Sequence, residues 1–446
     1  MRRLLLIIIL TAVVAEAQTP PQAAPQAPAT LPKELSLSQA LDIALTNNTT
    51  IREAQANFEQ LVGQTQRSRS VLLPQLTFDA HQALMTVNLQ GIGIDAPNAH
   101  GVQGPFGSMD ARLNLTLDIL NIAGRQSWKS YSSRQESSRF QIGNAREAVT
   151  LNVVGAYLQA LRLKATRDTL IEQARLANDL YRLTADRANQ GVASQLDANR
   201  AKQQVNALEQ QRLEAEQSYV AAKLEIATLL HTNITDNFEV ADPAAYGSEQ
   251  AMDRDATLKA ALLARPDYLA AESTMKSAEL ETKSSKSERI PTFKITASDG
   301  QSGNSPVHNN NTYRIAGTLS IPIINSGNIS GQVADAEAKY REATAKRDQL
   351  RAQIEADVLN AISGVEWALK QVAISVENVG LSRQELDLTR ARYTGGVADN
   401  TEVVNAQDRL SRADDANIRA QYTLGLSRAN LARASGGAES TYRKTK

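Results

Sequence analysis

The 446-residue sequence contains no cysteine, and this absence removes several classes of protein at once. It excludes disulfides, thiolate chemistry, cysteine-based zinc sites and a cysteine that could carry a lipid. Positive and negative side chains balance, with 48 of each, so the charge does not favour a nucleic-acid partner. Aromatic residues make up only 4% of the chain, a share that is low for a globular core and ordinary for alanine-rich helical bundles.

Long hydrophobic runs are absent after the first residues. Residues 1–17 have a positive start, a short apolar core and an Ala-Glu-Ala site, which together predict a secretory signal. Residues 18–34, rich in proline and alanine, are expected to form a disordered tether. No later segment approaches eighteen uninterrupted apolar residues, so the sequence predicts no transmembrane helix, and any membrane span is expected to be a β-barrel.

Proline is missing from two long parts of the chain, between Pro105 and Pro243 and after Pro322. Because proline costs roughly 3 kcal/mol inside a helix, its absence over such lengths fits very long helices. In the stretch 125–189, small and apolar residues recur at heptad spacing, and such a helix would be roughly 98 Å long. A second helix of this kind is expected at about 331–394. Taken alone, these features are equally typical of a coiled-coil rod.

Two pairs of segments alternate between apolar and polar residues, which predicts two β-hairpins. The first pair lies at 75–81 and 111–119, and the second lies at 292–297 and 313–321. Long loops are expected between the strands of each pair, at 88–107 and 298–311. Strands with one apolar face and one charged face suit a soluble sheet, but in an exported chain they are also typical of an outer-membrane barrel.

The chain repeats itself. Residues 41–80 align without a gap with 258–297, and Pro74 and Pro291, each between a helix and a strand, coincide. Each repeat is expected to pair one long helix with two shorter helices arranged in line. These observations divide the chain into repeat one at 35–250 and repeat two at 251–435, followed by a frayed tail at 436–446.

The order of these elements and three short motifs resemble the TolC family of outer-membrane efflux proteins. The motifs are Leu-Ser-Leu-x-x-Ala-Leu at 35–41, Arg-Pro-Asp-x-x-Ala-Ala-Glu at 265–272 and Arg-Tyr-x-x-Gly-Val at 392–397. The resemblance implies a mainly α fold with a small β part: a trimeric α-barrel of long coiled-coil helices continuous with a twelve-stranded outer-membrane β-barrel, four strands per chain. Open strand edges independently require several copies to close a barrel exposed to lipid.

The resemblance also implies a function and partners. The chain would be a homotrimeric, passive exit duct in the outer membrane, with a helical extension in the periplasm. It would serve a tripartite efflux pump or a type I secretion system, together with a periplasmic adaptor and an inner-membrane pump. The competing interpretation is an exported coiled-coil rod, or a periplasmic adaptor without a channel. The duplicated hairpins argue against an adaptor, which would have a single coiled-coil hairpin.

In this family the adaptor docks at the tips of the helical hairpins, and acidic residues beyond the second tip line the entrance. The matching tip residues are Gly191, Val192, Gly396 and Val397, although glycines also end ordinary helices. The entrance candidates are Glu402, Asn405, Asp399 and Asp197. Asn405 stands where an acid is known in a relative, so a second acidic ring is in doubt. The alternative for each carboxylate is an ordinary surface position.

Charged residues on the polar face of the predicted strands are candidates for the barrel lumen, or else for its rim: Arg112, Asp118, Lys294 and Arg314. The histidines sit in unrelated places, and no serine has a recognisable histidine and acid nearby. We therefore expect no metal site, no cofactor and no catalytic activity.

Overall fold

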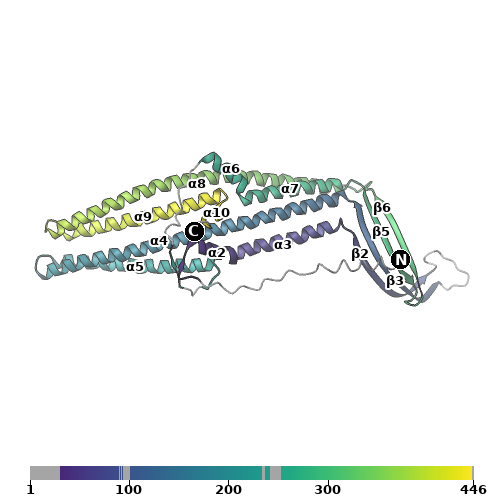
Figure 1. Ribbon diagram of the computed structural model, residues 1–446, viewed down its shortest axis with the longest axis horizontal. Helices are drawn as coiled ribbons and strands as arrows, with labels where there is room; N and C mark the ends of the chain where they lie inside the picture. Colours follow the sequence, from purple (N-terminus) through teal and green to yellow (C-terminus); the bar gives the residue numbers. More distant parts are fainter. Residues whose placement is uncertain are drawn as a thin grey trace.

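The computed structural model describes residues 31–89, 91, 93, 101–233, 237–241 and 253–443. The predicted signal and most of the predicted tether lie outside the described residues. The chain forms an elongated rod of long helices with a small sheet at one end (Figure 1). The expected mainly α fold with a small β part is confirmed.

The elements of repeat one follow the expected order. Two helices lead to a β-hairpin, and the hairpin leads through one long helix and a tight turn to a returning helix. Their bounds are α2 Leu37–Asn47, α3 Thr49–Ser70, β2 Gln75–Asn88, β3 Val102–Leu120, α4 Ile122–Asn189 and α5 Gln195–Leu229. Two short strands, β1 (Glu34–Leu35) and β4 (Glu239–Val240), pair in parallel with each other.

Repeat two has the same order and adds one short helix at its end. Its bounds are α6 Arg254–Ala264, α7 Pro266–Ser287, β5 Thr292–Gly303, β6 Asn309–Ser320, α8 Asn328–Thr394, α9 Asn400–Ala434 and α10 Ala438–Arg443. Helices α3 and α5 both pack along α4, and α7 and α9 both pack along α8 (Figure 1). Each long helix therefore has two shorter partners in line, as the sequence predicts.

Local side-chain chemistry sets the helix starts. A capping box starts α2: the Gln39 amide N–H donates to the Ser36 hydroxyl, and the Gln39 side chain accepts the Ser36 N–H at 3.0 Å. At the start of α4, Asn121 Oδ1 accepts the Gly124 N–H at 2.7 Å, so this helix begins at Ile122, slightly before the predicted stretch 125–189. Among the described residues, no helix combines the length and the apolar character needed to cross a membrane.

The sheet is antiparallel, with the strand order β2-β3-β5-β6. Leu115 lies between Leu76 on β2 and Ala297 on β5, and Asp118 lies opposite Lys294. Because cross-strand partners point to the same face, the sheet has one apolar face and one polar face. Within the described chain, β2 and β6 each pair along one side only, so the sheet has two free edges.

The predicted loops are too long, because strands occupy 102–107 in the first and 298–303 and 309–311 in the second. Strand β3 already begins at Val102, and Pro105 lies where the register shifts opposite β2, a position at which a strand tolerates proline. Strand β5 continues to Gly303. A Cβ at Gly300 would lie 2.4 Å from the Arg112 Cβ, so this glycine permits close strand packing and does not mark a turn.

The predicted frayed tail is wrong for residues 438–443. These residues form α10, which packs against α2, α4 and α9 and buries Ala438 and Tyr442. The Glu147 carboxylate on α4 accepts the N–H groups of Ala438 at 2.9 Å and Glu439 at 3.2 Å, and so caps the start of α10. Burial raises the pKa of Glu147, although these two N–H groups oppose the rise. The anchor lies 291 residues from Ala438 in sequence, where no local pattern reveals it.

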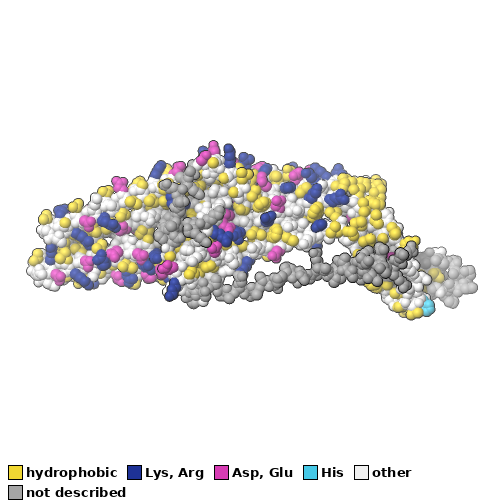
Figure 2. All heavy atoms as spheres, viewed as in Figure 1, with side chains coloured by type: hydrophobic (Ala, Val, Ile, Leu, Met, Phe, Trp, Pro, Cys, Tyr) yellow, Lys and Arg dark blue, Asp and Glu magenta, His cyan; other side chains and the backbone are white. Residues whose placement is uncertain are grey.

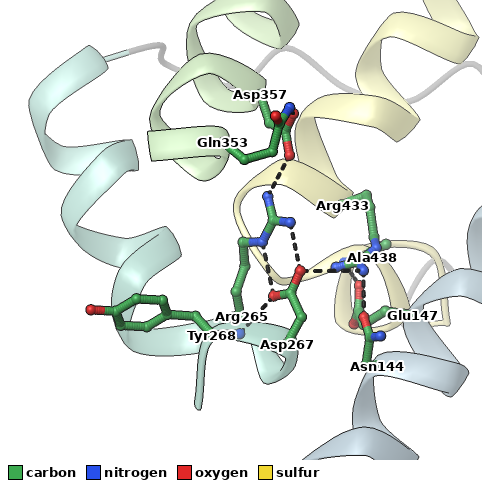
Figure 3. A network of polar contacts seen from close by, with 9 residues as sticks. All are labelled: Asn144, Glu147, Arg265, Asp267, Tyr268, Gln353, Asp357, Arg433 and Ala438. Atoms are coloured by element: carbon green, nitrogen blue, oxygen red, sulfur yellow. Dashed lines mark hydrogen bonds and ion pairs between the residues drawn. The ribbon is translucent and has the colours of Figure 1, made fainter. Parts of the chain in front are cut away.

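A network of charges joins α4, α7, α8 and α9 (Figure 3). Arg265, only 6% exposed, donates to Asp267 Oδ1 at 3.1 Å and Oδ2 at 2.7 Å, and to Asp357 Oδ2 at 3.0 Å. Arg433 lies 4.0 Å from Asp267 and donates to Asn144 at 2.5 Å. Burial alone would raise the pKa of Asp267, but the hydrogen bonds and charge of Arg265 outweigh burial and lower it.

Candidate functional site

The two helical hairpins end in turns of the same geometry at the end of the rod opposite the sheet (Figure 1). Helix α4 ends before Gly191, with a φ of +74°, and α8 ends before Gly396, with a φ of +77°. In each turn, two successive amides after the glycine donate to one carbonyl. Val192 N–H donates to Arg187 at 2.9 Å, and Val397 N–H donates to Arg392 at 2.9 Å.

Backbone conformation explains the two tip glycines, because a Cβ at either position would meet nothing within 4 Å. A left-handed φ is costly for residues with a side chain. The next residue at each tip is apolar and projects into solvent: Val192 is 74% exposed and Val397 is 72% exposed. The structure therefore places all four predicted tip residues at the ends of the hairpins.

The two hairpins contact each other just behind the tips. The Arg187 guanidinium donates to the carbonyls of Tyr393 at 3.0 Å and Thr394 at 3.1 Å, the last residues of α8. It also lies over the Tyr393 ring, 4.9 Å from the centroid, and the Tyr393 hydroxyl lies 3.1 Å from Thr184 Oγ1. A cation on the last carbonyls of a helix is favourable for the helix dipole. These contacts hold the end of α8 against α4, and sequence reasoning did not foresee them.

The predicted entrance residues lie just beyond the second tip, with partners that the sequence did not reveal. Glu402 Oε2 lies 3.3 Å from Arg392 Nη1, across the α8–α9 turn. Glu402 and Asn405 both line an open groove of about 860 Å³ between α8 and α9. Asp399 is the N-cap of α9, where its Oδ1 accepts the Glu402 N–H at 3.0 Å.

Asp197 occupies the corresponding place in the first turn of α5. Its carbonyl accepts the Asn400 side-chain N–H at 3.1 Å, and its carboxylate lies 3.8 Å from Arg200. Asp197 therefore lies at the contact between the two hairpins. Because Arg392 and Arg200 stand beside the two acids, each acid is partly neutralised.

The four predicted lumen residues lie on the sheet. Lys294 Nζ is 3.6 Å from Asp118 Oδ1 on the neighbouring strand, and Arg112 pairs with Asp110 along its own strand. Arg314 is opposite Ser298 in the β5–β6 register. By the strand alternation, all four belong to the polar face.

We expect Gly396→Ala to loosen the second tip without changing any packing contact. The left-handed φ costs a residue with a Cβ roughly 1–2 kcal/mol, so the turn should open about five- to thirtyfold more often. Hydrogen exchange at the Val397 amide should accelerate by that factor. Gly395→Ala is the matched control, because φ at Gly395 is −77° and alanine fits there. Equal exchange in the two variants would show that φ at Gly396 does not limit the turn.

No group of three or more possible metal ligands occurs in the part of the chain that the structure describes. The site geometry therefore consists of two solvent-exposed tips, a charged groove beside the second tip and a two-faced sheet at the opposite end.

Comparisons with known proteins bear on this geometry. The family model described as "Outer membrane efflux protein" matches residues 40–231 and 257–437. The pyoverdine export outer membrane protein OpmQ of Pseudomonas putida is 25% identical over 407 residues, covering 90% of this chain and 86% of that protein.

Solved structures show the same fold. The outer membrane protein VceC of Vibrio cholerae matches with a TM-score of 0.79 at 19% identity, covering 90% of this chain and 96% of that chain. The outer membrane channel CmeC of Campylobacter jejuni matches with a TM-score of 0.78 at 19% identity, covering 92% and 87%.

Proposed function

The chain belongs to the outer membrane efflux protein family, and on this premise we propose that it is a passive exit duct in the outer membrane. The duct carries substrates from a periplasmic adaptor and an inner-membrane pump to the exterior, in a tripartite efflux pump or a type I secretion system. The observation that carries the proposal is the two-faced sheet with two free edges at one end of a rod whose hairpins turn at the other. The duct performs no reaction, and its mechanism is the opening and closing of the tips.

The free strand edges support a homotrimer. An isolated sheet with open edges is not viable in lipid, because unpaired N–H and C=O groups there cost several kcal/mol each. Pairing β6 of one copy with β2 of the next removes both edges and closes a barrel. A coiled-coil rod or an adaptor gives no reason for the exposed apolar face that carries Leu76, Leu115 and Ile315.

The tips support docking of the adaptor. Val192 and Val397 are exposed apolar side chains at the rod end farthest from the membrane, where a periplasmic partner has access. In the trimer, Glu402 and its partner Arg392 recur around one axis at this mouth. We propose that the balance between these two charges sets the ion selectivity of the entrance.

Single-channel conductance in a planar bilayer tests the proposal. Glu402→Gln leaves Arg392 unpaired and should shift selectivity towards anions, whereas Arg392→Gln frees Glu402 and should shift it towards cations. Both shifts should be larger at low salt, because the Debye length falls from about 30 Å at 0.01 M to about 3 Å at 1 M. Multivalent cations should block the Arg392→Gln channel from the periplasmic side.

Both variants remove the same ion pair, so a purely structural effect would move them in the same direction. Selectivity shifts in the same direction would contradict the placement of Glu402 at the channel entrance. Asp197→Asn serves as a control and should change selectivity less, since Asp197 lies at the contact between the hairpins. Light scattering of the detergent-extracted protein should give a trimer, and a stable monomer would contradict the barrel.

A further inference from the structure

Four basic side chains crowd the ends of α3 and α4 that lie next to the sheet. Arg67 and Arg69 stand in the last turn of α3, and Arg125 and Lys129 stand at the start of α4; all four are exposed. The sequence has no aspartate or glutamate at 60–78 or 119–135. Arg134, further along α4, pairs with Glu281, whereas none of the four forms an ion pair with a residue that the structure describes.

Two contacts bring the helix ends into one cross-section of the rod. Thr65 Oγ1 on α3 lies 3.3 Å from the Tyr131 carbonyl on α4, and Ser284 Oγ on α7 donates to the Ala123 carbonyl on α4 at 2.8 Å. The end of α7 adds the exposed Arg289, which also lacks an ion pair among the described residues. We refer to these five cations as the basic collar: Arg67, Arg69, Arg125, Lys129 and Arg289.

Exposed apolar side chains lie between the basic collar and the sheet. Val71 and Leu73 follow the collar residues of α3 directly and are 47% and 46% exposed. Ile323 and Ile324, between β6 and α8, are each 88% exposed. Figure 2 shows hydrophobic side chains gathered where the rod meets the sheet, with Lys and Arg side chains directly beside them over the ends of α7 and α8.

We propose that the basic collar binds the phosphate-bearing headgroups of anionic phospholipids in the membrane leaflet that faces the rod. This inference rests on the proposed placement of the sheet in the outer membrane. The apolar side chains continue the apolar face of the sheet into the acyl region, and the collar begins where headgroups follow. Arginine and lysine keep their charged ends in the headgroup layer while their stems cover apolar surface.

Charge complementarity favours a lipid over other occupants. Arg67, Arg69, Arg125 and Lys129 have no acidic neighbour at 60–78 or 119–135, so the anions that neutralise these four come from outside the two segments; Arg289, by contrast, follows Glu288. Free phosphate would supply the charge but would leave Ile323 and Ile324 in water. A lipid supplies both the phosphate and the acyl chain, and each basic residue near an anionic leaflet favours binding by about fivefold.

The experiment measures lipid preference of the full-length protein in vesicles. Spin-labelled phosphatidylglycerol and phosphatidylcholine are compared for their association with the protein in phosphatidylcholine vesicles. The wild type should prefer phosphatidylglycerol. The variant with Arg67→Gln, Arg69→Gln, Arg125→Gln and Lys129→Gln should lose about fivefold or more of that preference.

Two matched variants separate charge from folding. Arg67→Lys, Arg69→Lys, Arg125→Lys and Lys129→Arg together keep the charge and should keep the preference. Glutamine at Arg52, Arg182, Lys259 and Arg383 removes the same charge from exposed positions elsewhere on the rod and should also leave the preference unchanged. Loss of preference in either variant would overturn the proposal.

Three further outcomes would each overturn the lipid proposal. An unchanged preference in the collar-to-glutamine variant would overturn the lipid site and leave the duct intact. If inorganic phosphate abolished the preference at an ionic strength where chloride did not, the collar would bind free phosphate and the lipid assignment would fall. A protein that enters no vesicle would overturn the outer-membrane placement, and the collar proposal with it.

Discussion

Replacing Arg265 by alanine should lower the free energy of unfolding by about 3–5 kcal/mol, the usual cost of removing one partner from a buried ion pair. Arg265 is 6% exposed, and its guanidinium makes three hydrogen bonds to Asp267 and Asp357. Without it, the half-buried Asp267 carboxylate keeps only the Tyr268 backbone N–H at 2.9 Å and the more distant Arg433 as partners. Urea unfolding of the detergent-solubilised protein measures the change. Arg254→Ala, at an exposed position in the same repeat, should cost under about 0.5 kcal/mol.

The pH dependence of the free energy of unfolding separates loss of the Arg265–Asp267 ion pair from a simple loss of packing. In the wild type the pKa of Asp267 is lowered, so its contribution to stability is present above its ordinary value of 3.8 and is lost as the pH falls further. In the Arg265→Ala variant, the Arg265 charge no longer opposes the effect of burial, so burial should raise the pKa of Asp267. Protonation then relieves the buried charge, so the deficit of the variant should shrink as the pH falls from 7 towards 4. A deficit that is constant with pH would point to packing alone.

Leu115→Arg should prevent assembly in the outer membrane. Leu115 lies between Leu76 and Ala297 on the apolar face, and an arginine on a lipid face costs about 2–4 kcal/mol near the bilayer midplane. Asn114→Arg is the matched control one residue away. Asn114 donates to Asp79 at 2.7 Å on the polar face, where an arginine could pair with the same carboxylate. The yield of folded trimer extracted from the membrane measures both.

This pair of variants tests the register of β3. If only Asn114→Arg failed, the faces of the sheet would be reversed, and if both variants assembled equally well, Leu115 would not face lipid. A shift by one residue moves every side chain of a strand to the opposite face, so no intermediate result fits the observed register.

The helical part of the fold was readable from the sequence because its signals are periodic and its boundaries are local. The second long helix was expected to stop at Thr394, and it does. Gly396 explains this success, since a left-handed turn depends on one residue type at one position. Strand ends were less readable, because glycine usually signals a turn. At Gly300 the same residue allows two backbones to approach, a fact that depends on the partner strand.

The same distinction between locally determined features and features that depend on a distant partner applies to the candidate site. The tip positions of Gly191 and Gly396 follow from local backbone geometry. The pairing of Glu402 with Arg392 and the contact of Arg187 with Tyr393 depend on how two helices approach each other. Residues that lie 206 positions apart, as Arg187 and Tyr393 do, leave no trace in a periodic pattern. The same is true of Glu147, which holds the final helix.

The two long helices have nearly equal lengths, with 68 residues in α4 and 67 in α8, and the returning helices α5 and α9 have 35 residues each. One extra residue displaces a helix end by about 1.5 Å, so a seven-residue deletion confined to α4 would raise one tip roughly 10 Å above its twin. A ring built from both kinds of tip tolerates no such step. In the proposed trimer we therefore expect changes in rod length to occur together in all four helices, whereas the hairpins of the sheet, at the other end, can change in length independently.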